Sequence, residues 1–386
     1  PNDFAIRISA KEWKDLNDDP LKPLLNRAIQ AQLAPGSVFK IVTATAMLED
    51  HMPSENYTVS CPGYGVFFGR QYHCWVYYSK TGVKSHGIVN LHDAILESCD
   101  VFFYNVGMKL GIDRLAYYAS GLGIGHKTGI DLPAEEAGLM PSQEWVERTF
   151  HRKWYAGEVI SVSTGQGAVQ TTPLQLARLI GGIASGGVFK QPHMLKDAPN
   201  VPEEKFPISE ATVEKVTEAM YGVINEPHGT GGKLRLTGVE FSGKSGTAQV
   251  IGYSKMNLIH KGSQFADNAW FVGYAPKRNP EICVAALVQE SGQHGGEAAG
   301  PVVRDVVKEF YDKRAKRTEG IINADAAKPD ATKPDAAKPY DPAKTAQAAT
   351  VAPSVVRAPD KRDAEPQATP VQQRTPVPRE PKPQQH

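Results

Sequence analysis

The sequence predicts a mixed α and β globular domain of about 315 residues, followed by a disordered tail. Helical spacing of apolar residues, as in residues 38–46, occurs in the same chain as strand-like runs such as residues 281–290. Composition changes sharply near Arg317, and the segment from there onward holds 12 of the 29 prolines and a single aromatic residue. Such a segment cannot bury enough apolar surface to offset its chain entropy. The predicted domains are therefore residues 1–315 and a Pro/Ala/Lys-rich tail, residues 316–386.

The charge balance and the ends of the chain restrict the class of protein. Lys and Arg number 43 and Asp and Glu number 42, so nothing predicts a nucleic-acid partner. No uncharged apolar run reaches the roughly 18 residues that span a bilayer. Because the chain begins at Pro1 without a methionine, we expect a fragment or processed form that has lost an N-terminal anchor. Four cysteines are too few for a disulfide scaffold.

Lys244 belongs to two incompatible motifs in GVEFSGKSGTAQV, residues 238–250. The spacing matches the phosphate-binding P-loop, and Lys244-Ser245-Gly246-Thr247 also matches the K-[ST]-G signature of penicillin-binding enzymes. A P-loop requires a helix directly after the lysine. Residues 246–252 are strand-like and bounded by glycines. A P-loop nucleotide-binding protein therefore remains only a remote alternative.

The penicillin-binding motif predicts a serine and a lysine three residues apart, and Ser37 and Lys40 meet that requirement. The helical spacing after Pro35-Gly36 places Ser37 in a first turn, with Lys40 one turn on and facing the same way. A serine hydroxyl is a weak nucleophile until a base takes its proton. Lys40 can act as that base if its pKa falls from about 10.4 toward about 7, through burial and a nearby cation. Lys244 is the candidate for that cation.

A third element lies in NLHDAILESCDVFFYNVG, residues 90–107. It predicts a helix with Asn90 as its N-cap, then the triplet Ser98-Cys99-Asp100, then a second helical stretch. The order S-x-x-K, S-x-[ND], K-[ST]-G is that of enzymes that form an acyl-serine with penicillin.

With these motifs in place, the sequence closely resembles the class B penicillin-binding proteins, specifically the elongation-type transpeptidases of the penicillin-binding protein 2 group. The resemblance covers nearly all of residues 1–313 and includes PLLNRAIQAQLAPGSVFK, SVSTGQGAVQTTPLQLA and NAWFVGYAP. It implies the penicillin-recognising serine transpeptidase fold, an antiparallel sheet flanked by helices plus a helical lobe that carries the nucleophile. It also implies that the membrane anchor and pedestal domain of such proteins are absent from this chain.

The resemblance implies catalytic roles for three side chains. Ser37 attacks the penultimate D-Ala carbonyl of a wall stem peptide ending in D-Ala-D-Ala, and Lys40 takes its proton. Ser98 relays a proton between either lysine and the leaving nitrogen, which suits a group that donates and accepts. An amine of a neighbouring stem then attacks the acyl-enzyme and forms the cross-link.

The same resemblance assigns the substrate contacts. Lys244, Ser245 and Thr247 bind the terminal carboxylate, and the backbone N–H groups of Ser37 and Thr247 form the oxyanion hole. Gly246 lets the strand edge approach the substrate. Asp100 replaces the Asn of the wider superfamily, and because an ionised Asp only accepts hydrogen bonds, its role stays open.

Three cysteines and a histidine form a second candidate site. The spacing is loose, but three thiolates with an imidazole are a closed zinc set, and some elongation-type members resemble this chain in carrying zinc at matching positions. The predicted ligands of a structural zinc are Cys61, Cys74, His86 and Cys99. A Cys61–Cys74 disulfide, unmetallated core thiols and His73 as a competing ligand remain alternatives. Cys283 is expected in the core and Glu97 at a solvated helix end.

The predicted function is a peptidoglycan D,D-transpeptidase of cell elongation, acylated by β-lactam antibiotics and needing no catalytic cofactor. By resemblance it works at the periplasmic face of the inner membrane with the RodA glycan polymerase and rod-shape scaffold proteins. A D,D-carboxypeptidase, a serine β-lactamase or a β-lactam sensor would share the fold and the motifs. A catalytically silent scaffold is a further alternative, which the intact Ser37, Lys40 and Lys244 disfavour.

Overall fold

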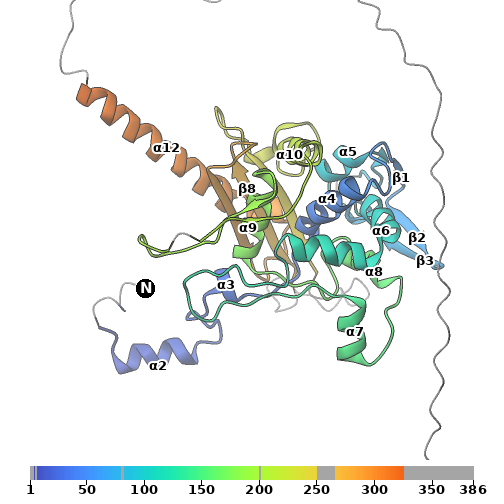
Figure 1. The fold of residues 1–386 in the computed structure, drawn as a ribbon, viewed down its shortest axis with the longest axis horizontal. Coiled ribbons are helices and arrows are strands. Elements are labelled where there is room, and N and C mark those ends of the chain that lie inside the picture. Colours follow the sequence, from blue (N-terminus) through green and yellow to red (C-terminus); the bar gives the residue numbers. More distant parts are fainter. Residues whose placement is uncertain (1–3, 5–6, 80–81, 200, 250–265, 326–386) are drawn as a thin grey trace, which may run out of the picture. The chain divides into compact units, whose positions relative to one another are not determined.

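The fold is organised around an antiparallel sheet of three strands, shown in the computed structural model of Figure 1. The structure describes Phe4 and residues 7–79, 82–199, 201–249 and 266–325. The strands, in spatial order, are β7 (Ser242–Ala248), β8 (Asn268–Ala275) and β9 (Ile282–Val288). Every residue of β8 is buried, because it is the middle strand and helices pack against the sheet.

Three long helices pack on this sheet. The helix α10 contacts β7, α9 contacts β9, and α12 contacts β8 and β9. Their bounds are Pro173–Ala184 for α9, Glu210–Asn225 for α10 and Gly300–Asp325 for α12. Thr172 and Ser209 cap α9 and α10 with side-chain hydrogen bonds, which satisfy N–H groups at the helix starts.

A second group of helices lies beside the small strands β1–β3 (Figure 1). The buried helix α4 packs on α6, and α6 packs on α8. Two antiparallel pairs, β1–β4 and β2–β3, flank this lobe. The bounds are α4 Lys40–Asp50, α5 Leu91–Leu96, α6 Asp100–Gly121, α8 Glu158–Val162, β1 Val59–Cys61, β2 Tyr64–Phe67, β3 Arg70–His73 and β4 Gly87–Val89.

The remaining elements are short. They are α2 Ala10–Asp18, α3 Arg27–Gln30, the 3-10 turns η1 Gly36–Phe39, η2 Trp75–Tyr78 and η3 Gly232–Leu234, α7 Gln143–Phe150, the pair β5 Val188–Phe189 and β6 Glu204–Lys205, and α11 Gly295–Ala298. No helix in the described part of the chain has the length and apolar character of a membrane span.

Local predictions can be compared with these elements. Asn90 caps α5 in a capping box with Asp93, and the run after residue 281 forms β9, as predicted. Lys244 lies inside β7, so the segment is a strand and the P-loop alternative is wrong. The helix α12 continues to Asp325, ten residues past the predicted domain end at residue 315. The predicted disorder of the remaining tail concerns residues outside the described range.

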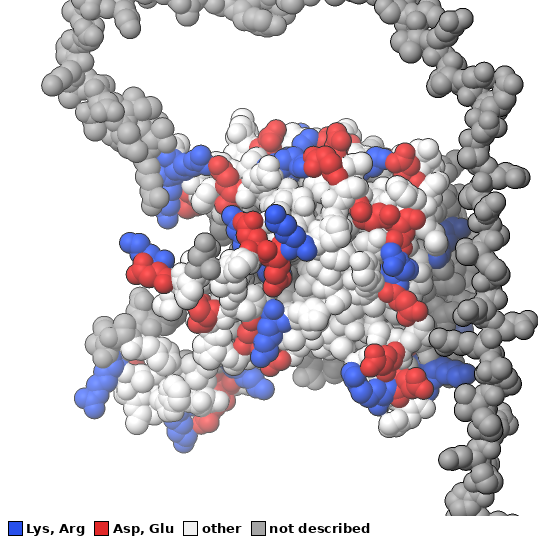
Figure 2. Space-filling view, in the orientation of Figure 1, with Lys and Arg blue, Asp and Glu red and all other residues white. Residues whose placement is uncertain are grey.

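Charged side chains of both signs are interspersed on the face shown in Figure 2. Opposite-sign pairs occur in the described chain, such as Arg178 with Glu204 and Lys277 with Glu218. The face in Figure 2 therefore shows no extended patch of one sign that would attract a polyanion.

Candidate active site

Ser37 lies in the 3-10 turn η1, directly before Lys40 begins α4. This turn contacts β7 backbone to backbone. A Cβ atom on Gly36, whose φ is +54°, would lie 2.4 Å from the Thr247 carbonyl oxygen, and one on Gly246 would lie 2.6 Å from the Pro35 carbonyl oxygen. Gly246 therefore admits the nucleophile turn itself, which corrects the prediction that it makes room for the substrate.

Lys40 is completely buried and its ammonium is fully engaged. Its Nζ donates to the Ser98 carbonyl oxygen at 2.7 Å, to Ser98 Oγ at 3.2 Å and to Asp100 Oδ1 at 2.6 Å. Three acceptors match the three protons of an ammonium group. Burial raises the pKa of the Asp100 carboxyl, an effect that the charge of Lys40 opposes.

Lys244 approaches the same serine from the sheet. Its Nζ lies 2.9 Å from Ser98 Oγ and 3.1 Å from the Ser245 carbonyl oxygen, and the residue is completely buried. Burial first, and then the positive charge of Lys40, lower the pKa of Lys244 well below its usual value. The sequence argument expected Lys244 to be the fixed cation beside a neutral Lys40. Instead, Lys40 is ion-paired with Asp100 at 2.6 Å, and Lys244 is the amine whose pKa burial lowers.

Asp100 acquires a defined role from its neighbours. Its Oδ1 accepts from Lys40 and its Oδ2 accepts from the Trp75 backbone N–H at 2.8 Å. Both contacts require an acceptor, so a carboxylate suits this position where the amide of an Asn would offer one donor and one acceptor.

Ser37, Ser98, Ser245 and Thr247 line one cleft, as the motif analysis predicted. Neither Lys40 nor Lys244 is among the described residues that line it. The carboxylate contact predicted for Lys244 is therefore not offered by the cleft wall, which presents hydroxyl groups while the amine lies behind them. In this arrangement Lys244 is placed to act on a bound carboxylate through its field and through Ser98.

The motif analysis missed several residues of this cleft. Thr230 Oγ1 lies 3.1 Å from Ser245 Oγ, and Gln166 Nε2 donates to the Thr247 carbonyl oxygen at 3.1 Å. Trp75 also lines the cleft. Gln166 stands between two glycines and Thr230 follows one, and neither pattern is specific enough to indicate a site by itself.

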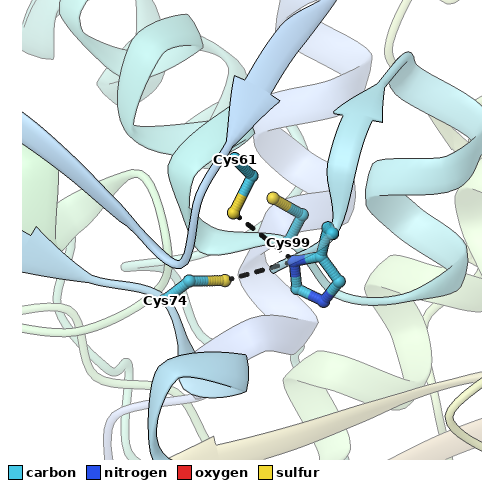
Figure 3. A group of neighbouring side chains, drawn as sticks. Cys61, Cys74 and Cys99 are labelled. Carbon is cyan, nitrogen blue, oxygen red and sulfur yellow. Dashed lines mark hydrogen bonds between the residues drawn. The ribbon is translucent and has the colours of Figure 1, made fainter. Parts of the chain in front are cut away.

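The three cysteines and His86 meet on the other side of the Ser98–Asp100 segment. Figure 3 shows the sulfur atoms of Cys61, Cys74 and Cys99 converging from β1, from the residue after β3 and from the start of α6. All three cysteines are completely buried, and His86 Nδ1 lies 3.6 Å from Cys61 Sγ and 3.5 Å from Cys74 Sγ. The four potential ligand atoms lie within 4.8 Å of one another.

This donor set fits a tetrahedral zinc ion. Zn–S bonds of about 2.3 Å and Zn–N bonds of about 2.0 Å separate ligand atoms by about 3.5–3.8 Å, the range of the two distances to His86. Hydrogen bonds from Cys74 and Cys99 lower the pKa of Cys61 to about 3, and a thiolate is the form that binds metal. Within the described chain, the buried His86 Nε2 makes no hydrogen bond. Glu97 Oε2 lies 3.7 Å from it, on the side of the ring where metal-bound histidines commonly face a carboxylate.

The structure also bears on the predicted disulfide, on His73 as a ligand and on Cys283. All four cysteines are free, so no Cys61–Cys74 disulfide is present. His73 stacks on Tyr77 and bonds to the Tyr78 hydroxyl at 2.7 Å, away from the thiols. Cys283 lies half-buried on β9, where burial raises its pKa, as expected for a structural thiol.

Comparison with known proteins gives the same family as the motifs in the sequence. Residues 5–308 match the penicillin binding protein transpeptidase domain family. The peptidoglycan D,D-transpeptidase MrdA of Acinetobacter baumannii is 39% identical over 312 residues, which are 78% of this chain and 45% of that protein. The chain thus spans about half the length of the curated relatives it matches.

Two solved structures are similar along most of the described chain. One is the complex between penicillin-binding protein PBP2 and MreC from Helicobacter pylori, with a TM-score of 0.70 and 30% identity, covering 81% of this chain and 55% of that one. The other is the structure of a peptidoglycan synthase complex that coordinates polymerization and crosslinking. It has a TM-score of 0.67 and 33% identity, and the match covers 78% of this chain and 50% of that one. These neighbours confirm the predicted fold class. The chain therefore belongs to the penicillin-binding protein transpeptidase family, in its class B, elongation-type branch.

Proposed function

We propose that this chain is the catalytic domain of a peptidoglycan D,D-transpeptidase that cross-links stem peptides during cell elongation. The observation that carries the proposal is the shared hydroxyl of Ser98, which lies 3.2 Å from Lys40 Nζ and 2.9 Å from Lys244 Nζ and opens into the cleft of Ser37. Two buried amines joined through one hydroxyl form a path along which a proton can move without exposure to water.

In the proposed acylation step, Ser37 Oγ forms a bond to the penultimate D-Ala carbonyl carbon. The substrate carboxylate binds the hydroxyl wall near Ser245, and its charge favours a protonated Lys244. A proton then passes from Lys40 through Ser98 to Lys244, which leaves Lys40 neutral and able to accept the Ser37 proton. When the peptide C–N bond breaks, the leaving nitrogen takes the proton of Ser98, Lys40 returns to Ser98 the proton that it took from Ser37, and terminal D-Ala departs.

The second step decides between related activities. Attack on the acyl carbon by a stem-peptide amine gives a cross-link, attack by water gives a carboxypeptidase or β-lactamase, and no attack gives a sensor. The similarity to MrdA along most of the chain favours the amine. A D,D-carboxypeptidase or a β-lactam-binding sensor remains the alternative.

Mass spectrometry tests both steps. Incubation with a penicillin should give one covalent adduct, which peptide mapping places on Ser37 and on no other serine. A stem pentapeptide supplied with an amine acceptor should then yield the cross-linked product in excess of the hydrolysed tetrapeptide. An adduct on Ser98 or Ser245, or none, would overturn the catalytic assignment, and hydrolysis alone would favour the carboxypeptidase.

We further propose that Cys61, Cys74, His86 and Cys99 hold a structural zinc ion. The bound metal would stabilise the fold at the Ser98–Asp100 segment and would take no part in the chemistry. The Asp100 backbone N–H donates to Cys74 Sγ at 3.2 Å, so a ligand and the catalytic segment share a hydrogen bond.

The cellular setting of the enzyme is a further part of the proposal. We propose that the chain acts at the periplasmic face of the inner membrane, attached through an N-terminal anchor outside this sequence. Its partners would be a rod-shape scaffold protein of the MreC kind, as in the Helicobacter pylori complex, and the RodA glycan polymerase. Co-purification of the full-length protein with each candidate tests this part.

A further inference from the structure

Trp75 makes two hydrogen bonds to the segment that carries Ser98. Its indole Nε1 donates to the Glu97 carbonyl oxygen at 2.9 Å, and its backbone N–H donates to Asp100 Oδ2 at 2.8 Å. Trp75 therefore holds the segment at two points: at Glu97, immediately before Ser98, and at Asp100, two positions after Ser98. The indole also lines the cleft, in edge contact with His294, whose ring centroid lies 6.1 Å away.

The segment needs this support because Ser98 has a strained backbone. Its φ is +57°, in the left-handed region that side chains other than glycine rarely adopt. In this conformation Ser98 Oγ lies between Lys40 and Lys244. The turn joins the end of α5 to the start of α6. If the turn relaxed toward an ordinary conformation, the hydroxyl would leave the path between the two amines.

The indole N–H is the part of this arrangement that depends on side-chain identity. Any residue except proline keeps the backbone hydrogen bond to Asp100, whereas only a side chain with a donor at this reach can hold the Glu97 carbonyl. That carbonyl ends the α5 helix, where backbone acceptors lack partners within the helix.

We propose that Trp75 is a positioning residue for acyl transfer: its indole N–H holds the strained turn so that Ser98 Oγ bridges the two lysines. The inference rests on the proposed function, since it concerns the proton path of that reaction. Trp75 acts through the turn and accepts no proton. Its loss should therefore slow the chemical step and leave the first binding of substrate nearly unchanged.

The test compares Trp75→Phe, which keeps an aromatic wall but removes the N–H, with Trp145→Phe on the remote helix α7. Stopped-flow acylation by a chromogenic penicillin or cephalosporin gives the acylation rate constant and the binding constant separately. For Trp75→Phe we expect the rate constant to fall about tenfold, the kinetic equivalent of one buried hydrogen bond, with binding unchanged within twofold. Trp145→Phe should change neither, and the metal content of both variants should equal that of the parent.

A second substitution covers the case in which Trp75→Phe folds poorly. Genetic incorporation of benzothienylalanine at position 75 replaces the indole N–H with sulfur and keeps the ring shape, and it should give the same loss of rate. An unchanged rate constant, or a loss confined to the binding constant, would overturn the inference. If the parent protein forms no adduct at all, the proposed function fails before the role of Trp75 is tested.

Discussion

Two buried polar clusters share the segment Ser98-Cys99-Asp100 and face away from each other. On one side, Lys40 and Lys244 meet at Ser98 Oγ beside an open cleft. On the other, Cys99 joins two further thiols and an imidazole in a group whose cysteines are completely buried. Ser98 and Cys99, adjacent residues of one turn, thus belong to two different groups: Ser98 to the lysine cluster beside the cleft and Cys99 to the buried thiol cluster.

The difference shows how the fold separates chemistry from support. The lysine cluster carries charges that burial disfavours, and it opens to a cleft because a substrate must reach it. The thiol cluster consists of potential metal ligands whose cysteines are completely buried, which suits a group that stabilises structure. The hydrogen bond from the Asp100 N–H to Cys74 Sγ connects the two, so the rigid cluster can position the reactive one.

The largest effect should come from breaking the ion pair of the lysine cluster. Lys40→Met would leave the Asp100 carboxylate buried without its partner and would remove the base. We expect penicillin acylation to fall by more than about 1000-fold, and the free energy of unfolding to fall by about 3–5 kcal/mol, as for other broken buried pairs. Adduct formation and urea unfolding measure these effects. A variant acylated within tenfold of the parent rate would mean that another group accepts the Ser37 proton.

The thiol cluster should show the opposite balance, with a large effect on stability and a smaller one on rate. If zinc is bound, the parent protein should contain close to one equivalent by elemental analysis, and Cys99→Ala or chelation should lower the melting temperature. Acylation should slow by a smaller factor than in Lys40→Met, because the turn loosens while the lysines remain.

Cys283→Ala is the matched control for this substitution, since it removes a half-buried thiol outside both clusters. It should change neither metal content nor acylation rate. Parent protein without metal would rule out the zinc proposal, and equal effects of the two cysteine substitutions would remove the contrast between the clusters.

Lys244→Met should raise the activation free energy of acylation by about 2–4 kcal/mol, because the end of the proton path and the field of the amine behind the hydroxyl wall are lost. Its effect on stability should depend on pH. The pKa of Lys244 is depressed in the folded state, so between that value and about 10.4 the unfolded state binds more protons and stability rises with pH.

The parent should therefore gain stability relative to Lys244→Met as the pH is raised toward 10, by at most about 1.4 kcal/mol per pH unit. Parallel stability curves for the two proteins would show that Lys244 keeps its ordinary pKa. An acylation loss below about threefold would show that the carboxylate is held without this amine.

The smallest effect should come from removing the tail, whose sequence supplies no residue of either cluster. The sequence predicted the end of the domain at residue 315, but α12 continues to Asp325, so the informative truncation follows Ala327. Melting temperature and acylation rate should stay nearly unchanged. A drop of more than a few degrees would show that the tail stabilises the domain.

Much of the candidate site could be predicted because its motifs are local. Ser37 and Lys40 are three residues apart, and Asn90 caps α5 through its own next turn, so backbone geometry alone brings these groups together. Trp75 and Thr230 could not be predicted in this way, because each contacts the site across a long sequence separation and belongs to no local pattern.

The sequence by itself determined which residues carry the chemistry, and the comparison with relatives agreed on the family and the fold. Only the tertiary structure decided which contacts those residues make and how their surroundings affect each lysine. Lys40 and Lys244 meet Ser98 across 58 and 146 residues of chain, and their protonation depends on which groups desolvate or pair with each amine. Desolvation and charge pairing arise from packing between distant segments, so a motif can name both lysines without revealing which of them pairs with a carboxylate and which has its pKa lowered by burial.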